Sequence, residues 1–226
     1  MDPINLVKII TTGVTTSIAL IIGFRVLLLN KTDWLNRWFF LFFISSSLGF
    51  LIYAIYHVIL NNADIIIPLM IMAHTFFNFV FISLIMTVFV LEKYTKVAMS
   101  MKYLGTMLIL FAIMSVGYII FRPTLDLVSY GAGIVDTSTP FIWFILVNTI
   151  RVILAIYVLS RYIVMVKKIE GETRNRVKWF SIGVTVAIIG VLINVIGGLI
   201  SSIVIEVLAL VIVDIGAILI LKGFLI

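Results

Sequence analysis

Cysteine is absent from the 226-residue chain, and histidine occurs only twice. Without cysteine, the protein has no disulfide bond, thiol nucleophile or thiolate metal site. The two histidines form no His-x-x-x-His or His-Glu-x-x-His pair, and they are too few for a zinc-dependent seven-helix lipid hydrolase. No serine or threonine lies in a nucleophile-elbow sequence. We therefore expect no metal, no cofactor and no enzymatic activity.

Charged residues are also scarce. They make up 12% of the chain, whereas hydrophobic residues make up 63%, well above the near-half apolar content of ordinary soluble domains. No stretch is long and polar enough to form a separate soluble domain. The apolar run after Met1 lacks the basic region and the cleavage site of a secretory signal, so we expect it to be retained. The composition indicates one integral membrane domain over residues 1–226.

Seven apolar windows are long enough to cross a bilayer, for which about 20 mostly apolar residues are needed. They predict an all-α bundle of seven transmembrane helices in contact with the lipid bilayer. The windows run over about residues 4–29, 38–60, 66–91, 102–121, 141–166, 178–202 and 203–226.

Basic residues divide the connecting loops into two sets. The loops after the first, third and fifth windows are rich in lysine and arginine, whereas Arg122 is the only basic residue in the alternate loops. The positive-inside rule predicts that the basic loops are cytoplasmic, with the N-terminus outside and the C-terminus inside. This bias accounts for the net charge of +6, so we expect no nucleic-acid partner. The residues that carry the bias are Arg25, Lys31, Arg37, Lys93, Lys96, Lys102, Arg161, Lys167, Lys168, Arg174, Arg176 and Lys178.

Two loops are long enough to have a role of their own. The segment Lys167 to Lys178 mixes both charge signs, which suits a solvated surface where a cytoplasmic signalling partner docks. The long outer loop lies between Pro123 and Pro140 and contains the turn signal Tyr130-Gly131-Ala132-Gly133. We expect this outer loop to fold back as a lid or a short hairpin.

Small residues recur at steps of three and four in the sixth window and at steps of seven in the last. Each set falls along one side of its helix, and small residues let membrane helices approach closely. The spacing predicts that the two stripes face each other. The first stripe is Gly183, Ala187, Gly190, Asn194, Gly197 and Ser201, and the second is Ala209, Gly216 and Gly223.

Polar side chains within the predicted helices gather in the outer half of the membrane, whereas the inner half is nearly pure hydrocarbon. Ionisable groups at such depth usually face a protein interior. This asymmetry predicts an outward-facing pocket. Its candidate ligand-binding residues are Lys8, Tyr53, His57, His74, Asn78, Asn148, Arg151, Asn194, Glu206 and Asp214.

Arg151 and Asp214 are predicted at about the same depth, so we expect them to form a buried ion pair. The pair either holds the fifth and seventh helices in register or forms a pocket floor where a ligand carboxylate or phosphate competes for the guanidinium. His74 and Asn78 either bond to neighbouring helices or contact the ligand.

Two segments carry a family resemblance. They are Asn36-Arg37-Trp38-Phe39-Phe40-Leu41-Phe42-Phe43 with the following Gly49 and Tyr53-Ala54, and Arg174-Asn175-Arg176-Val177-Lys178. With the seven-helix topology, they resemble the N-terminal sensor region of prokaryotic histidine kinases. Such regions lead into a cytoplasmic kinase or cyclase domain, whereas this sequence ends at Ile226. The resemblance implies output through a separate partner, unless the chain is a fragment.

We therefore expect a receptor-like sensor in the cell membrane that binds a small ligand in the outer pocket. An anion is one option for this ligand because of Arg151. Two alternatives stay open: a small transporter or channel gated by Arg151 and Asp214, and a non-catalytic structural subunit of a membrane complex. The inner half has little wettable surface, which disfavours a transport path.

Overall fold

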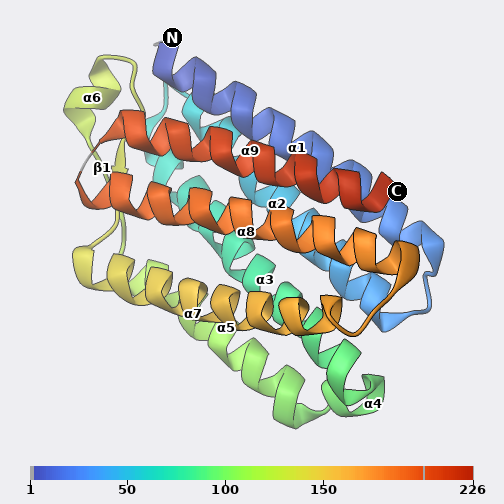
Figure 1. The fold of residues 1–226 in the computed structure, drawn as a ribbon. Coiled ribbons are helices and arrows are strands. Elements are labelled where there is room, and N and C mark those ends of the chain that lie inside the picture. Colours follow the sequence, from blue (N-terminus) through green and yellow to red (C-terminus); the bar gives the residue numbers. More distant parts are fainter. Residues whose placement is uncertain (1–2, 201, 226) are drawn as a thin grey trace.

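The structure is a computed structural model that describes residues 3–200 and 202–225. Seven of its helices are long and apolar enough to cross a membrane, so the predicted bundle of seven such helices is confirmed (Figure 1). In chain order the elements are α1 (Pro3–Leu29), α2 (Trp34–Val58), η1 (Ala63–Ile65), α3 (Ile66–Lys93), α4 (Thr95–Ala98), η2 (Met101–Gly105), α5 (Thr106–Ile120), β1 (Thr124–Leu125), α6 (Leu127–Gly131), β2 (Thr137–Ser138), α7 (Phe141–Val166), α8 (Gly171–Leu199) and α9 (Ile203–Leu225).

Two long helices begin before their apolar windows. The Asp33 carboxylate accepts a hydrogen bond from the Leu35 amide at 3.0 Å and so caps α2, which begins at Trp34. Helix α8 begins at Gly171 because its charged first turns contain good helix formers and need no apolar surroundings. The predicted loop Lys167 to Lys178 is therefore mostly the start of α8.

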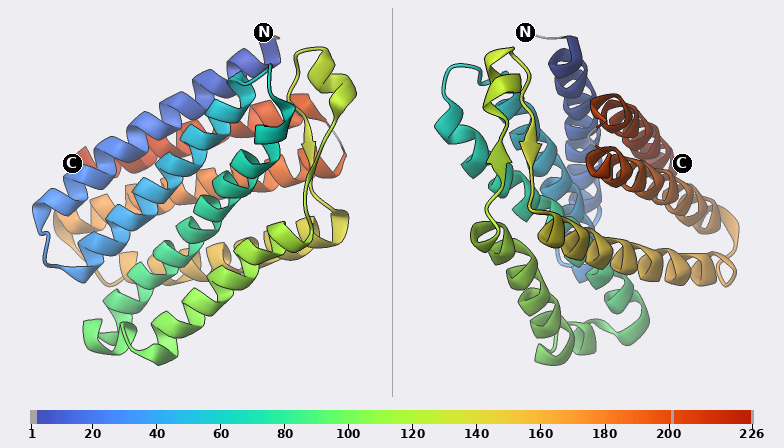
Figure 2. Two further views of the ribbon diagram at one scale, coloured as in Figure 1. Left: turned by 180° about the vertical axis from the view of Figure 1, so that it is seen from behind. Right: turned by 90° about the vertical axis from the view of Figure 1, so that its left-hand side faces the viewer.

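Six long helices close into a ring. Helix α1 packs against α2, α2 against α3, α3 against α7, α7 against α8, α8 against α9, and α9 returns to α1. Helix α5 lies outside the ring and packs on α3 and α7 (Figure 2). This arrangement directs one side of six helices toward a shared interior.

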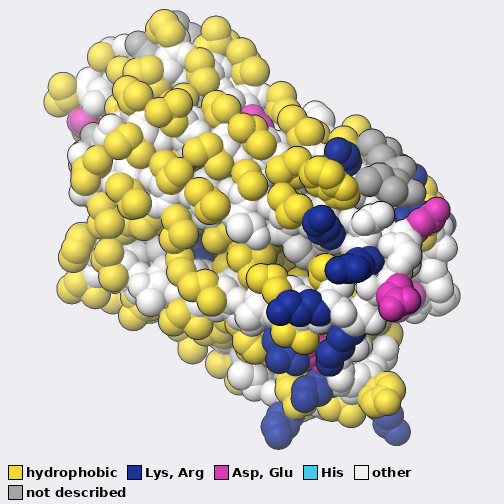
Figure 3. Space-filling model, in the orientation of Figure 1, with side chains coloured by type: hydrophobic (Ala, Val, Ile, Leu, Met, Phe, Trp, Pro, Cys, Tyr) yellow, Lys and Arg dark blue, Asp and Glu magenta, His cyan; other side chains and the backbone are white. Residues whose placement is uncertain are grey.

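The two ends of the bundle differ in charge. The connections α1–α2, α3–α5 and α7–α8 meet at one end with the C-terminal end of α9, and lysine and arginine side chains gather there (Figures 1 and 3). We call this the basic end. The opposite end holds the start of α1 and the strands β1 and β2, and we call it the hairpin end.

Helices α8 and α9 approach each other through their glycines. A Cβ atom built on Gly216 would lie 2.7 Å from the Ala187 backbone nitrogen and 2.8 Å from the Gly183 carbonyl oxygen, so no side chain fits there. Gly190 is similarly close to the Ala209 carbonyl. The prediction that the two small-residue stripes face each other is thus confirmed. Of the predicted stripe members, Ser201 lies outside the described residues.

The loop between α5 and α7 forms the expected short hairpin. Strands β1 and β2 pair antiparallel, with Thr124 opposite Ser138, and α6 lies between them (Figure 2). Asp126 caps α6, and its hydrogen bond from the Ser129 hydroxyl lowers the pKa of the carboxyl. The Asn5 side chain donates to the Gly133 carbonyl at 2.7 Å, so the hairpin is held against α1.

Candidate functional site

A cavity of ≈ 540 Å³ lies inside the helix ring. Side chains from α1, α2, α3, α5, α7, α8 and α9 line it, and residues 135–140 of the hairpin form part of its wall. The volume falls within the range of about 300–1,000 Å³ found for small-molecule sites. Many of its polar lining residues belong to two clusters.

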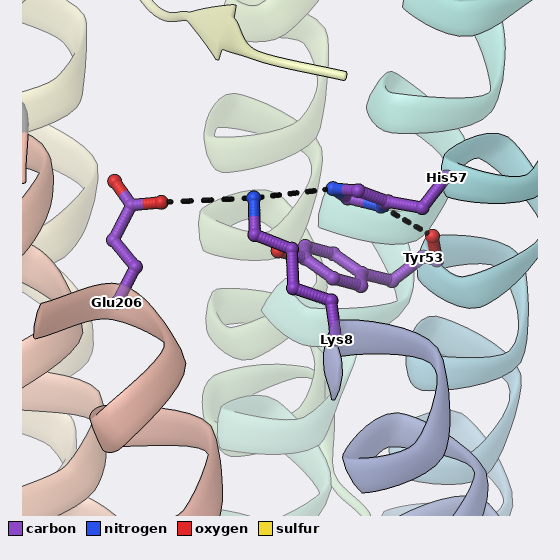
Figure 4. A network of polar contacts seen from close by, with 4 residues as sticks. All are labelled: Lys8, Tyr53, His57 and Glu206. Atoms are coloured by element: carbon purple, nitrogen blue, oxygen red, sulfur yellow. Dashed lines mark hydrogen bonds and ion pairs between the residues drawn. The ribbon is translucent and has the colours of Figure 1, made fainter. Parts of the chain in front are cut away.

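The first cluster surrounds Lys8 of α1, whose side chain is nearly enclosed (Figure 4). The Lys8 ammonium lies 3.4 Å from Nε2 of His57 and 4.0 Å from Oε2 of Glu206. His57 Nδ1 lies 2.8 Å from the Tyr53 carbonyl oxygen. A carbonyl oxygen can only accept, so Nδ1 carries the proton and Nε2 accepts from Lys8 when the ring is neutral. The charge of Lys8 is therefore matched by the carboxylate of Glu206.

The second cluster surrounds Arg151 of α7, which lines the cavity and is 6% exposed. Its guanidinium donates to the Asn78 side-chain oxygen from Nη2 at 2.6 Å and from Nε at 3.0 Å, and to the Asn148 oxygen at 3.2 Å. The Tyr118 hydroxyl and His74 Nδ1 lie at 3.4 and 3.5 Å. The hydrogen-bonding capacity of Arg151 is thus met by side chains that can all be neutral.

No carboxylate forms a salt bridge with Arg151 among residues 3–200 and 202–225. Within that part of the chain the ion pairs join Lys8 to Glu206 and Arg161 to Glu92. A buried cation without a nearby anion is electrostatically costly even when it is fully hydrogen bonded. Asp136 and Glu206 also line the cavity, but neither forms an ion pair with Arg151, whose charge therefore lies in the wall without a carboxylate beside it.

The predicted ion pair between Arg151 and Asp214 is wrong. Asp214 accepts a hydrogen bond from the Thr15 hydroxyl of α1, whereas Arg151 bonds to Asn78 of α3. Depth along the helices was the basis of the prediction, but contact also depends on which neighbour each helix faces. Helix α9 packs between α8 and α1, so Asp214 turns to α1 and away from α7.

Most of the other predicted site residues line the cavity. His57, His74, Asn148, Arg151, Asn194 and Glu206 do so, with Lys8 and Tyr53. Asn78 is fully buried and bonds to Arg151 from α3, outside the set of lining residues, and Asp214 is also outside that set. We expect neither Asn78 nor Asp214 to touch a ligand directly.

Sequence reasoning left Tyr118 and Asp136 out of the candidate site, although both line the cavity. Tyr118 comes from α5, outside the helix ring, and its ring stacks on His74 with centroids 4.7 Å apart. The available signal was that Tyr118 follows Ser115, another polar residue of the same helix, by three residues, which places both side chains on one side of it. Asp136 belongs to the hairpin, where no helical spacing could indicate which way it points.

Much of the remaining cavity wall is apolar, although Thr15, Ser46 and Asn194 also line it. From α1, α2, α3, α8 and α9 it includes Ile18, Ala19, Ile22, Phe42, Phe43, Leu84, Val184, Ile188, Ala217 and Ile220. These residues lie nearer the basic end than Lys8 and Arg151 do, as their positions along the helices show. The arrangement can hold a polar group at the two clusters and a hydrocarbon group beyond them.

No protein-family model, curated protein or solved structure was found to match this chain. Among residues 3–200 and 202–225, no three histidine, aspartate or glutamate side chains come together as a metal-binding group.

A double-mutant cycle tests the observed partners of Arg151. Because Arg151 bonds to Asn78 and not to Asp214, the effects of Arg151→Leu and Asp214→Asn on the free energy of unfolding should add to within about 0.5 kcal/mol. Arg151→Leu and Asn78→Leu should instead be coupled by about 1 kcal/mol or more. Unfolding by SDS in mixed micelles measures both cycles. Strong coupling in the first cycle and none in the second would contradict the structure.

Proposed function

We propose that this protein is a receptor-like membrane sensor that binds a small anionic ligand in the cavity and signals through a separate partner. The observation that carries the proposal is the Arg151 guanidinium, which lines the cavity and has no carboxylate partner among the described residues. A ligand carboxylate or phosphate would supply the missing charge, and a guanidinium offers such groups strong, charge-assisted hydrogen bonds. Lys8, which pairs with Glu206, adds a second cation to the cavity wall.

We also propose that the hairpin end faces the outside of the cell membrane and the basic end faces the cytoplasm. The gathering of lysine and arginine at one end supports this orientation (Figure 3). It places the N-terminus outside and the C-terminus inside. The cavity then lies beneath the outer face, next to the hairpin.

Cysteine labelling tests the orientation directly, because the chain has no cysteine of its own. Val128→Cys lies in α6 at a site that is 85% exposed, and Thr173→Cys lies in the exposed start of α8. A membrane-impermeant maleimide should label Val128→Cys in intact cells and Thr173→Cys only after permeabilisation. The opposite pattern would contradict the proposed orientation.

The proposed signal path is α8. This helix runs without a break from Gly171 at the basic end to Leu199, and Val184, Ile188 and Asn194 along it line the cavity. Its glycine contacts with α9 bring the two backbones close together. A ligand that prefers one arrangement of α8 and α9 would change the population of that arrangement at the segment Lys167 to Lys178, where the partner would dock.

Hydrogen exchange measures this transmission. The protein in phosphatidylcholine nanodiscs is exposed to acetate, benzoate, decanoate or inorganic phosphate, and the tightest binder is used at saturation. We expect altered amide exchange over residues 167–178 in the wild type. Arg151→Gln should weaken binding at least tenfold, whereas Arg151→Lys should retain part of it because the charge is kept.

Arg161→Gln is the matched control on the same helix, since Arg161 pairs with Glu92 and does not line the cavity. Binding of the probe should be unchanged in this variant. Unchanged exchange at residues 167–178 under saturating probe would refute the signalling role. Binding that is equally tight in Arg151→Gln would refute the anion site.

A transporter or channel is less well supported by the cavity. The predicted gate of Arg151 and Asp214 does not form, and the cavity wall toward the basic end is apolar. A polar solute crossing the bundle needs wettable surface along its whole path. Flux of the bound probe into liposomes that contain only this protein would favour transport over sensing.

A further inference from the structure

The cavity changes character along its length. At a rise of 1.5 Å per residue, Arg151 lies about 15 Å from the start of α7 and Ile22 about 28 Å from the start of α1. Both helices start at the hairpin end. Lys8, Glu206 and Asp136 lie on the hairpin side of Arg151, whereas the lining toward Ile22 is hydrocarbon apart from the hydroxyls of Thr15 and Ser46.

The apolar part of the cavity places a requirement on the ligand. Aliphatic and aromatic walls offer water no hydrogen-bond partners, so a fully polar molecule gains nothing by extending there. A hydrocarbon chain in the same space is removed from water, and its affinity rises about threefold to fourfold for each methylene buried. A ligand that fits both parts is amphiphilic.

We propose that the cavity binds a single-chain amphiphile with an anionic head, either a carboxylate or a phosphate monoester. The head lies between Arg151 and Lys8, and the chain runs toward the basic end past Ala217 to Ile22 and Ile220. This inference rests on the anion site of the proposed function and adds the hydrocarbon chain to it. The volume of ≈ 540 Å³ suits a ligand of small-molecule size, and we assign one chain to it.

The dependence of affinity on the length of the ligand tests whether the cavity binds a hydrocarbon chain. Acetate, hexanoate, decanoate and tetradecanoate are titrated by calorimetry into protein in phosphatidylcholine nanodiscs, with protein-free nanodiscs as the blank. Affinity for the free aqueous ligand should rise about threefold per methylene until the apolar part is filled. Decanol, which has the chain without the charge, should bind at least tenfold more weakly than decanoate. The same series of alkyl phosphates tells a phosphate head from a carboxylate head, and tight binding of either supports the proposal.

The position of the chain is tested by filling the apolar part. Ala217 of α9 lines the cavity, so Ala217→Phe should weaken decanoate binding at least tenfold while hexanoate binding changes less than twofold. The next residue, Ile218, is 51% exposed and is not part of the lining, so Ile218→Phe is the matched control and should leave the series unchanged. Ala19→Leu, which fills the same part from α1, replaces Ala217→Phe if that variant does not fold.

Three results would overturn the proposal. Acetate binding as tight as decanoate binding would show that the cavity does not bind a hydrocarbon chain, but it would leave the anion site of the proposed function intact. Decanol binding as tight as decanoate binding would show that the cavity does not select an anionic head, and it would refute the proposed function as well. A length dependence that neither filling variant alters would place the chain outside this cavity. Conversely, the expected length dependence with unchanged exchange at residues 167–178 would retain the amphiphile site and refute only the signalling role.

Discussion

The structure depends on a guanidinium held in the bundle interior by amides. Arg151 joins α7 to α3 through two hydrogen bonds to Asn78, and Asn148 one turn earlier on α7 completes the support. Amide oxygens satisfy the hydrogen bonds of an arginine but do not neutralise its charge. The fold therefore fixes the position of the guanidinium without pairing its charge, and under the proposed function the ligand would meet it in the cavity.

Two other cations of the helices make the contrast clear. Lys8 lies near Glu206, and Arg161 lies 2.5 Å from Glu92, so both have a carboxylate from another helix. Asp214, the carboxylate at nearly the depth of Arg151, bonds to Thr15. Charge pairing is thus used where α1 meets α9 and where α3 meets α7 near the basic end. Arg151 lines the cavity, as Lys8 does, but it has no carboxylate partner among the described residues.

Local features of the fold could be predicted from the sequence, because hydrophobic length, glycine spacing and turn residues act over a few neighbouring residues. The seven helices, the Gly183 to Gly216 contact and the β1–β2 hairpin are of this kind. The pairing of Arg151 could not be predicted, because it depends on the order of helices around the ring and on the rotation of each. The distance of Asp214 from the end of its helix could be estimated from the sequence, but that distance gives no information on which neighbouring helix Asp214 faces. The cavity itself, and the role of Tyr118 from the outlying helix α5, follow from the same packing.

The most direct test of the amphiphile site is a cryo-electron microscopy map of the protein in nanodiscs that contain decanoate. We expect Arg151 to contact Asn78 and Asn148 in this map. We also expect its guanidinium to meet the head of an elongated ligand density that extends toward Ile22. A map in which Arg151 pairs with a carboxylate of the protein, or in which side chains fill the space between Arg151 and Ile22, would contradict these expectations.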